Sequence, residues 1–529
     1  MRSIPILVLT ACFAFYLNPA DAQPSAHVQL SPRERIGKKI YLSGESHSDS
    51  PIDAWLGNPP MKVSAKMLPC MNCHGLDGKG KPEGGVYPSN LNWSMLTKRY
   101  GLTHPSGRKH RAYDEETLKR AITRGIDPSG NKIGSSMPHF SMSQDDLSCL
   151  VAYLKRIEDD RDPGVDASHI TIATMVPMDG PMGKLGNTVK DVLEALFEDI
   201  NVSGGIYNRT IDLRVIPTGQ TPGESIDQLK KTLETESIFA LVAPYVPNAE
   251  DRLIELAAKR EIPVIGSLGT SPDDPDGSNR FLFYLMSGMS IQAKALVDAY
   301  MEDLGPDGTP RAGLLSRAGK PYEIYAKSIK DQCRRRNIPL TVLSEYTSET
   351  FTPETLSEEV GKQDALFFIG PASECTRILK HTSEGGRTPR VYQLGSFLER
   401  EIFDCPEPFQ GKLFATFQNV RSAQAPRDIQ AYRDFLNRHN ISAPPSTVLL
   451  SAYCAGRLLI ESLTDAGGQP RREFLIRDLE GLYKHETGLI PPLTFGPNRR
   501  IGAYGADLVS IDLSAKSITS TNRWIKPKE

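Results

Sequence analysis

The chain has 529 residues, and its 62 basic and 64 acidic side chains give a formal net charge of −2. A nearly balanced chain gives no electrostatic reason to expect a nucleic acid partner, so we expect none. At this length the chain can bury about three domain-sized hydrophobic cores, so we expect more than one domain.

Residues 1–22 have the three parts of a secretory signal peptide. A short basic start is followed by an apolar run at residues 4–17, which is too short to span a membrane comfortably. Residues 20–22 (Ala-Asp-Ala) then fit a cleavage site with small residues. We therefore expect release into the periplasm. The alternative is a lipoprotein, because residues 9–12 resemble a lipobox that would make Cys12 the lipid-bearing residue.

A Cys-Met-Asn-Cys-His motif begins at Cys70 and includes Cys73 and His74. Two thiols at this spacing, followed directly by an imidazole, are typical of covalent haem c attachment. Each thiol adds to a haem vinyl group, and the histidine is placed to bind the iron. A zinc half-site would need a second Cys/His pair at ligand spacing, and none follows. The motif therefore predicts one haem c, rather than zinc or a redox thiol pair.

The iron needs a sixth ligand, and Met137 in the Ser-Met-Pro segment is the best candidate. A thioether is a soft, neutral ligand that favours Fe(II) and raises the reduction potential above that of a bis-histidine haem. His139 and His104 are the main alternatives, and His110 and Met142 also compete.

Three helices are expected around this motif. Ser31 and Glu34 form a capping box that opens the first helix. Residues 113–122 predict a second helix with acidic residues in its first turn, ending at Gly125. Ser143 opens a third helix, which carries an apolar face.

This order of helices and motifs resembles the class I cytochrome c family over residues 30–158. The resemblance implies an all-α domain with His74 as the proximal ligand and Met137 as the distal one. The crossing of the terminal helices would place Gly37 and Tyr41 against Leu150 and Tyr153.

A charged stretch that breaks at Pro163 and Gly164 marks a domain boundary, and a second domain is expected over residues 168–520. There, apolar strand signals alternate with helical stripes, which predicts βαβ units and parallel sheets. Its length favours two lobes. The strand candidates are residues 169–175, 211–216, 239–243, 263–266, 312–315, 365–369, 391–394 and 413–417.

Four segments of this region occur in a recognisable order: residues 177–181, 201–206, 261–271 and 364–368. In that order they resemble the type 1 periplasmic binding proteins, in particular the branch that binds leucine, isoleucine and valine. The resemblance implies a two-lobed α/β domain that closes on an amino-acid-like small molecule. It implies no catalytic residues, so we do not expect an enzyme.

Ligands of open α/β sheets bind at the carboxyl ends of the strands, near helix N-termini. The chain departs from the family there, because residues 245–248 replace a small hydroxyl pair and Arg317 lies where an acidic turn is usual. These departures leave the chemical class of the ligand open. The candidate ligand-binding residues are Asp179, Asn248, Thr270 and Ser271 on lobe one, and Tyr322 and Ser396 on lobe two.

Two further groups carry hypotheses. Cys375 and Cys405 could form a disulfide in an oxidising compartment. A basic cluster could be a docking surface for an acidic redox partner, a set of partners for the haem propionates, or a solvated loop. Its members are Lys98, Arg99, Arg108, Lys109, His110 and Arg111.

These features predict a periplasmic electron carrier that bears a small-molecule binding module. Its partners would be a dehydrogenase or another cytochrome, and a small ligand. The alternative is a solute-binding protein for an ABC transporter permease, in which the haem is accessory.

Overall fold

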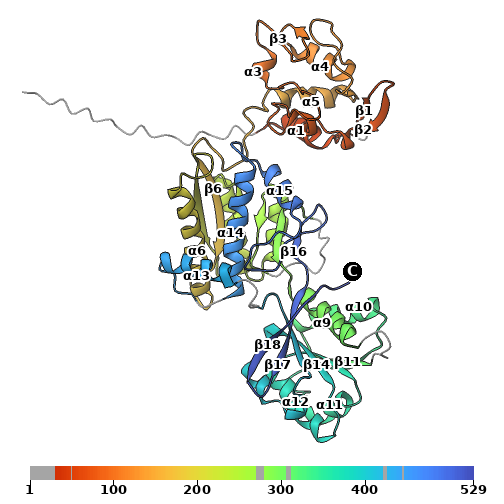
Figure 1. Ribbon diagram of the computed structural model, residues 1–529, viewed down its shortest axis with the longest axis vertical. Helices are drawn as coiled ribbons and strands as arrows, with labels where there is room; N and C mark the ends of the chain where they lie inside the picture. Colours follow the sequence, from red (N-terminus) through yellow and green to blue (C-terminus); the bar gives the residue numbers. More distant parts are fainter. Residues whose placement is uncertain are drawn as a thin grey trace, which may run out of the picture. The chain divides into compact units, whose positions relative to one another are not determined.

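The computed structural model describes residues 30–48, 50–269, 279–304, 311–420, 426–443 and 446–528. The expected signal peptide, Cys12, Thr270 and Ser271 lie outside these residues. The chain divides into two compact units, the first ending at Arg161 and the second beginning at Asp162 (Figure 1). Within the described part, no helix combines the length and apolar character needed to cross a bilayer.

The first unit is mainly helical and confirms the expected cytochrome c fold class. It also contains short strands that the sequence did not predict. Its helices are α1 (Pro32–Ser43), α2 (Met71–His74), α3 (Trp93–Leu96), α4 (Glu115–Arg124) and α5 (Gln144–Leu154), with the 3-10 turn η1 (Ala65–Met67). Its strands are β1 (Asp53–Leu56), β2 (Met61–Ser64) and β5 (His139–Ser141), paired antiparallel in the order β2-β1-β5, and the pair β3 (Leu102–Thr103) and β4 (Lys109–His110).

The expected helix boundaries are present. Ser31 caps α1: its hydroxyl accepts from the backbone N–H of Glu34, whose carboxylate accepts from the backbone N–H of Ser31. Asp114 caps α4, which ends at Gly125 in the left-handed conformation. The Ser143 hydroxyl caps α5. These caps satisfy backbone donors and carbonyls that a helix terminus leaves without partners.

Helices α1 and α5 cross as the family resemblance implies. The rings of Tyr41 and Tyr153 lie 5.6 Å apart between centroids, and both side chains are fully buried. At the crossing, a Cβ placed on Gly37 would lie only 2.0 Å from the carbonyl oxygen of Cys149. Only glycine allows the two backbones to come this close.

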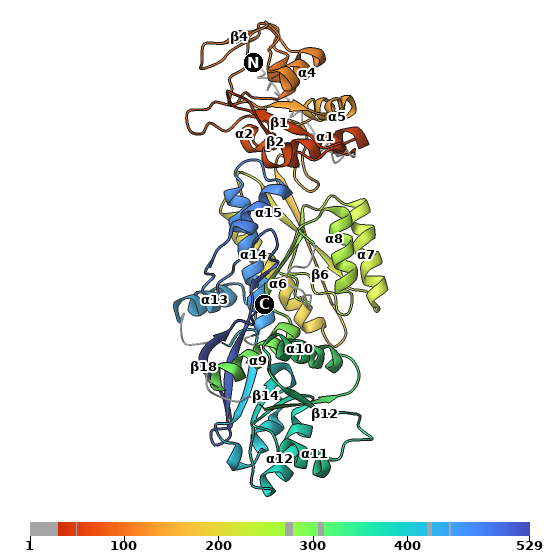
Figure 2. The ribbon, with the colours of Figure 1, turned by 90° about the vertical axis from the view of Figure 1, so that its right-hand side faces the viewer.

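The second unit contains two lobes, each built on one sheet (Figures 1 and 2). The strands of lobe one are ordered β16-β10-β9-β8-β6-β7, and every neighbouring pair is parallel. They are β6 (His169–Val176), β7 (Thr210–Pro217), β8 (Ala240–Val242), β9 (Val264–Ile265), β10 (Leu282–Met286) and β16 (Ile501–Ala503). Apolar side chains from helices cover both faces, as parallel sheets require. On one face lie α6 (Gly183–Val202), α13 (Pro426–Arg438), α14 (Thr447–Asp465) and α15 (Arg472–Gly481), and on the other α7 (Pro222–Thr235) and α8 (Glu250–Arg260).

Lobe two has strand order β12-β11-β13-β14-β15-β17-β18. The first five strands are parallel, as expected, whereas β17 and β18 form an antiparallel hairpin added to the edge. The strands are β11 (Ala312–Arg317), β12 (Leu340–Tyr346), β13 (Ala365–Ile369), β14 (Arg390–Leu394), β15 (Leu413–Phe417), β17 (Ala506–Asp512) and β18 (Ser517–Ile525). The helices are α9 (Met289–Leu304), α10 (Tyr322–Arg335), α11 (Pro353–Val360) and α12 (Ala372–Glu384), with 3-10 turns η2 (Gly395–Phe397), η3 (Arg400–Asp404) and η4 (Glu407–Phe409).

The chain passes from lobe one to lobe two after β10, returns after β15, and crosses again between β16 and β17. Ser287, in the first crossing segment, is hydrogen-bonded to both of the other crossing segments. Its hydroxyl donates to the carbonyl oxygen of Ala503 at 3.0 Å and accepts from the backbone N–H of Gly505 at 2.9 Å. Gln418 donates to the carbonyl oxygen of Ser287 at 2.7 Å. The crossing segments are therefore hydrogen-bonded into one cluster.

The sequence did not predict β10, β12, β16, β17 or β18. Strand β10 is a short, fully buried apolar run, and such a run cannot be told from a buried helix by its periodicity. Strands β12 and β18 are the two edge strands of the lobe-two sheet. Their side chains are mostly exposed or partly exposed, so their apolar pattern is weak.

Candidate functional site

A cavity of about 460 Å³ lies inside the first unit, and Cys70, Cys73, His74 and Met137 all line it. The structure therefore brings together the haem-binding residues expected from the sequence. Most of the remaining wall is apolar, as suits a macrocycle. The apolar wall includes Leu68, Leu91, Leu96, Leu118, Ile122, Ile133, Phe140, Leu150 and Leu154.

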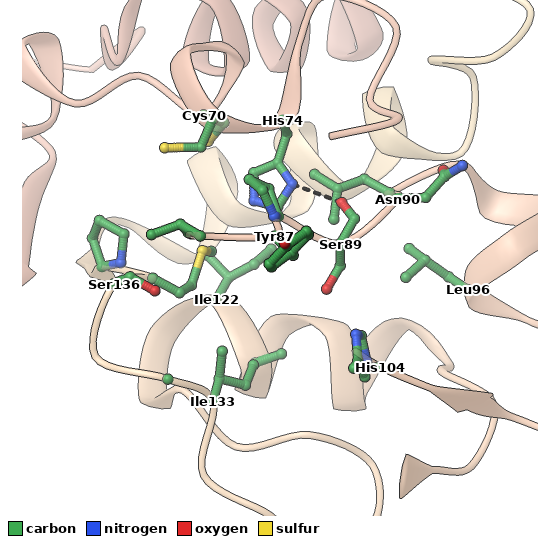
Figure 3. A pocket seen from close by; sticks show the side chains of 18 of the residues that line it. Cys70, His74, Tyr87, Ser89, Asn90, Leu96, His104, Ile122, Ile133 and Ser136 are labelled. Atoms are coloured by element: carbon green, nitrogen blue, oxygen red, sulfur yellow. Dashed lines mark hydrogen bonds between the residues drawn. The ribbon is translucent and has the colours of Figure 1, made fainter. Parts of the chain in front are cut away.

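His74 is held in one orientation. It ends the single turn α2, and its Nδ1–H donates to the carbonyl oxygen of Ser89 at 2.9 Å. Figure 3 shows this bond, with the His74 ring on one side of the cavity and Ile122 and Ile133 on the other. Burial lowers the pKa of His74, so the imidazole is neutral. A neutral ring with its Nδ1 proton engaged leaves the Nε2 lone pair available to a metal ion, which is a common arrangement at metal sites.

The Cys70 side chain fits thioether attachment better than thiolate chemistry. Burial raises the pKa of the Cys70 thiol to about 12, which disfavours the thiolate that zinc binding or disulfide exchange requires. Among the described residues, no three His, Cys, Asp or Glu side chains are grouped to hold a metal ion. The donor set and the apolar wall therefore fit a haem.

The candidates for the sixth ligand differ in whether they line the cavity and in whether their donor atoms are already hydrogen-bonded. Met137 lines it, whereas Met142 and His139 do not. His104 also lines it, but its Nε2 accepts a hydrogen bond from Arg108 at 2.9 Å, so that lone pair is already engaged. His110 lines it as well, and because its Nδ1 donates to a backbone carbonyl as that of His74 does, its Nε2 stays a competing donor.

The basic cluster divides into two groups. Arg108 lines the cavity and pairs with the fully buried Asp127, with 2.7 Å between Nη1 and Oδ2. Burial acts to raise the pKa of Asp127, but hydrogen bonds from Asn131 and Arg108 lower it overall, so the carboxylate stays charged. Arg108 could meet a haem propionate. Arg99, Lys109 and Arg111 are exposed, as expected for a solvated or docking surface.

On lobe one, a buried carboxyl group lies at the carboxyl ends of the strands. Glu250 is the first residue of α8, and its Oε1 accepts from the hydroxyls of Ser267 (2.7 Å) and Tyr284 (2.9 Å). Its Oε2 is buried and has no hydrogen-bond partner among the described residues. A Cβ on Gly269 would lie 2.1 Å from this oxygen, so the backbone at Gly269 lies close against the carboxyl group.

Burial raises the pKa of Glu250 to about 7, although hydrogen bonds from Ser267 and Tyr284 oppose this shift. The group therefore changes charge near neutral pH.

On lobe two, an ion pair lies at the carboxyl ends of the strands of that lobe's own sheet. Arg317 ends β11, and its Nη1 is 3.0 Å from Oε1 of Glu374 in the first turn of α12. The Tyr346 hydroxyl donates to the other Glu374 oxygen at 2.8 Å, and Arg317 also donates to Ser348. The charges of Arg317 and Glu374 therefore satisfy each other.

Two aromatic rings lie beside this ion pair. Tyr322 at the start of α10 and Phe397 after β14 have ring centroids 5.2 Å apart, and both are partly buried. The Arg317 guanidinium lies 5.9 Å from the Tyr322 ring centroid. A flat, apolar ligand could pack against such a pair.

The structure places the sequence-predicted ligand residues as follows. Asp179 follows β6 and Asn248 follows β8, and both are exposed. Tyr322 is partly buried, and Ser396 is exposed in η2. Glu250 and Glu374 were missed, because an acidic residue in a first helical turn is ordinary in any sequence.

The suggested disulfide between Cys375 and Cys405 is not formed in the structure, which has both as buried free thiols. They share the core between the sheet of lobe two and α12. The sulfur of Cys405 instead lies 3.4 Å from the Thr376 hydroxyl.

Comparisons with known proteins agree with this architecture. The periplasmic binding protein family model matches residues 169–515, and the cytochrome c model matches residues 63–158. A search of curated proteins by sequence found no match.

Several solved structures share the fold of the second unit. A putative branched-chain amino acid ABC transporter protein from Rhodospirillum rubrum has a TM-score of 0.55 at 13% identity, covering 66% of this chain and 99% of that one. An ABC transporter substrate-binding protein from Aeropyrum pernix has a TM-score of 0.51 at 15% identity, with 68% and 97% coverage. A fatty acid ABC transporter substrate-binding protein from Thermomonospora curvata has a TM-score of 0.50 at 15% identity, with 70% and 95% coverage. At these identities the likeness shows the fold alone. The chain belongs to the periplasmic binding protein family and carries a cytochrome c domain ahead of that module.

Proposed function

We propose that this protein is a periplasmic electron carrier with one haem c, and that its second unit is a small-molecule binding module. Cys70 and Cys73 would hold the haem through thioether bonds, with His74 and Met137 as its axial ligands. When bound, the haem supplies a one-electron Fe(III)/Fe(II) couple.

The observation that carries the proposal is the composition of one cavity. Two thiols, an imidazole oriented by Ser89 and a thioether line the same mainly apolar space. The His74 imidazole would donate electron density to the haem iron, and the Met137 thioether would favour the reduced state of that iron. The apolar wall would exclude water. If His74 and Met137 both bind the haem iron, no position would be open for a substrate, so these residues support electron transfer rather than an enzymatic role.

Carbon monoxide binding tests this assignment. In the haem-loaded, dithionite-reduced protein, axial ligation by His74 and Met137 should prevent carbon monoxide from changing the visible spectrum. The Met137→Ala variant should bind carbon monoxide and serves as the positive control. Rapid binding by the unsubstituted protein would indicate an open iron site and would favour an enzyme such as a peroxidase.

The second unit supports a solute-binding role by its family and fold. Related structures are described as proteins for branched-chain amino acids or fatty acids, so an amino-acid-like or other small organic solute is the natural ligand class. We propose a redox partner in the periplasm, such as a dehydrogenase or another cytochrome. An ABC permease would be an additional partner if the module also delivers its solute.

A further inference from the structure

The carboxyl edge of the lobe-two sheet has the features of a site for an uncharged ligand. Strands β11 and β13 are neighbours, and the chain leaves β11 toward β12 on one side and leaves β13 toward β14 on the other, so the two connections diverge. Ligands of open α/β sheets bind where the connections diverge in this way. Arg317 and Tyr322 follow β11 there, and Glu374 follows β13.

The charged groups at this point are already neutralised. Arg317 and Glu374 pair at 3.0 Å, the Tyr346 hydroxyl donates a further hydrogen bond to Glu374, and the Ser348 hydroxyl accepts one from Arg317. A ligand ammonium group would have to displace Arg317 from Glu374, and a ligand carboxylate would have to displace Glu374 from Arg317. Either exchange would break the ion pair and leave one partly buried charge without its partner, and a ligand with both charges would have to separate the pair as well.

The aromatic pair supplies a different kind of contact. Tyr322 and Phe397 come from separate segments, yet their rings lie 5.2 Å apart and neither is fully buried. The ring centroid of Phe397 also lies 6.0 Å from that of Tyr325, so the Phe397 ring is packed against a second aromatic side chain of α10. Aromatic rings at these spacings attract a further ring through offset or edge-to-face packing.

Lobe one gives an independent observation that also favours an uncharged ligand. Glu250 is placed where the chain leaves β8 and β9, and one of its oxygens is buried without a partner among the described residues. Its described hydrogen-bond partners are hydroxyl groups, not cations. A protonated carboxyl group has one O–H donor and brings no net charge to this edge of the sheet, so the described part of lobe one supplies no cationic side chain beside Glu250 to balance a ligand carboxylate.

We propose that the second unit binds a small, uncharged aromatic molecule whose ring packs against Tyr322 and Phe397, rather than a free amino acid. This proposal rests on the solute-binding role proposed above and names the class of solute.

Isothermal titration of the full-length, haem-loaded protein tests the class with four probes that share one ring. Benzyl alcohol is uncharged, benzoate is an anion, benzylamine is a cation and L-phenylalanine carries both charges. We expect benzyl alcohol to bind at least about tenfold more tightly than each charged probe. Tighter binding of L-phenylalanine or benzoate, or no binding of benzyl alcohol up to about 10 mM, would overturn the proposal.

Two variants test the location. Phe397→Leu should weaken benzyl alcohol binding about five- to tenfold, because it removes one ring of the pair. Phe414→Leu is the matched control: Phe414 packs on the same core but stacks on Tyr392 inside the sheet, so its loss should leave the affinity unchanged. Equal affinity in the Phe397 variant and the unsubstituted protein would contradict the site.

These outcomes are separable from the proposed function. Binding of L-leucine or L-phenylalanine without benzyl alcohol would reject the uncharged aromatic class but keep a solute-binding module. Failure of every probe would also reject the class, while carbon monoxide binding and redox titration would still report on the cytochrome unit.

Discussion

Among single residues, Met137 is our proposed sixth ligand of the haem iron. Met137 lines the cavity, whereas the Nε2 of His104 is engaged by Arg108. We predict that Met137→Ala abolishes the sulfur-to-iron charge-transfer band of the oxidised protein, because the other thioether that lines the cavity, that of Met95, belongs to α3 and not to the loop of Met137. Absorption spectroscopy of the purified variant measures this.

Met142→Ala is the matched control, since Met142 lies five residues further along but does not line the cavity. It should keep the band. A Met137 variant that keeps the band, or a Met142 variant that loses it, would reject Met137 as the ligand.

Glu250 should make the stability of the second unit depend on pH. Its pKa is raised from 4.5 to about 7 in the folded state, mainly by burial. Between these values the folded state binds more protons than the unfolded state, so the free energy of unfolding falls as pH rises from about 4.5 through 7. The loss attributable to this group is on the order of 2–3 kcal/mol.

Glu250→Gln should remove most of that pH dependence, as measured by urea unfolding of the second unit at several pH values. Glu255→Gln, at an exposed position of the same helix, should leave it unchanged. A pH profile that is the same in the Glu250 variant and the unsubstituted protein would show that another group is responsible.

The limits of sequence reasoning are clear at this scale. Cys70, Cys73, His74 and Met137 could be selected because covalent attachment fixes both residue type and spacing. Glu250 could not, because its unusual state depends on burial beneath Gly269 and on Tyr284, which is distant in sequence.

At the scale of elements, the crossing of α1 and α5 closes the cytochrome fold. The expected helix starts at Ser31 and Ser143 are present because capping residues act locally and leave a local signal. The short strands of the first unit and the hairpin of β17 and β18 depend on partners far along the chain, so local patterns did not reveal them.

We predict that Gly37→Ala destabilises the first unit by about 1–3 kcal/mol, because its Cβ would collide with the backbone of Cys149. At an exposed helix position the same change would instead stabilise the protein by up to about 1 kcal/mol. The sign of the change in unfolding free energy therefore tells whether Gly37 lies in a close helix crossing. Thermal unfolding followed by haem absorbance measures the effect.

Lys39→Ala is the control, because Lys39 lies on the exposed side of the same helix. It should change stability by no more than about 0.5 kcal/mol. A Gly37 variant as stable as the unsubstituted protein would mean that α1 and α5 do not approach as closely as the structure shows.

For the whole molecule, the sequence indicated both fold classes, since one rests on a covalent attachment motif and the other on repeated βαβ units. The family match over residues 169–515 confirms the second. The chemical class of the solute could not be predicted, because it depends on which charges neutralise each other in the folded protein. The pairing of Arg317 with Glu374 is visible only in three dimensions.

The central claim is that His74 and Met137 hold a haem that carries one electron. A spectroelectrochemical titration of the full-length protein tests it most directly. We predict a single reversible curve with a slope of about 59 mV per decade, as expected for one electron. Its midpoint should fall in Met137→His, because bis-histidine ligation stabilises Fe(III). An irreversible curve, or a midpoint that this substitution leaves unchanged, would contradict the account.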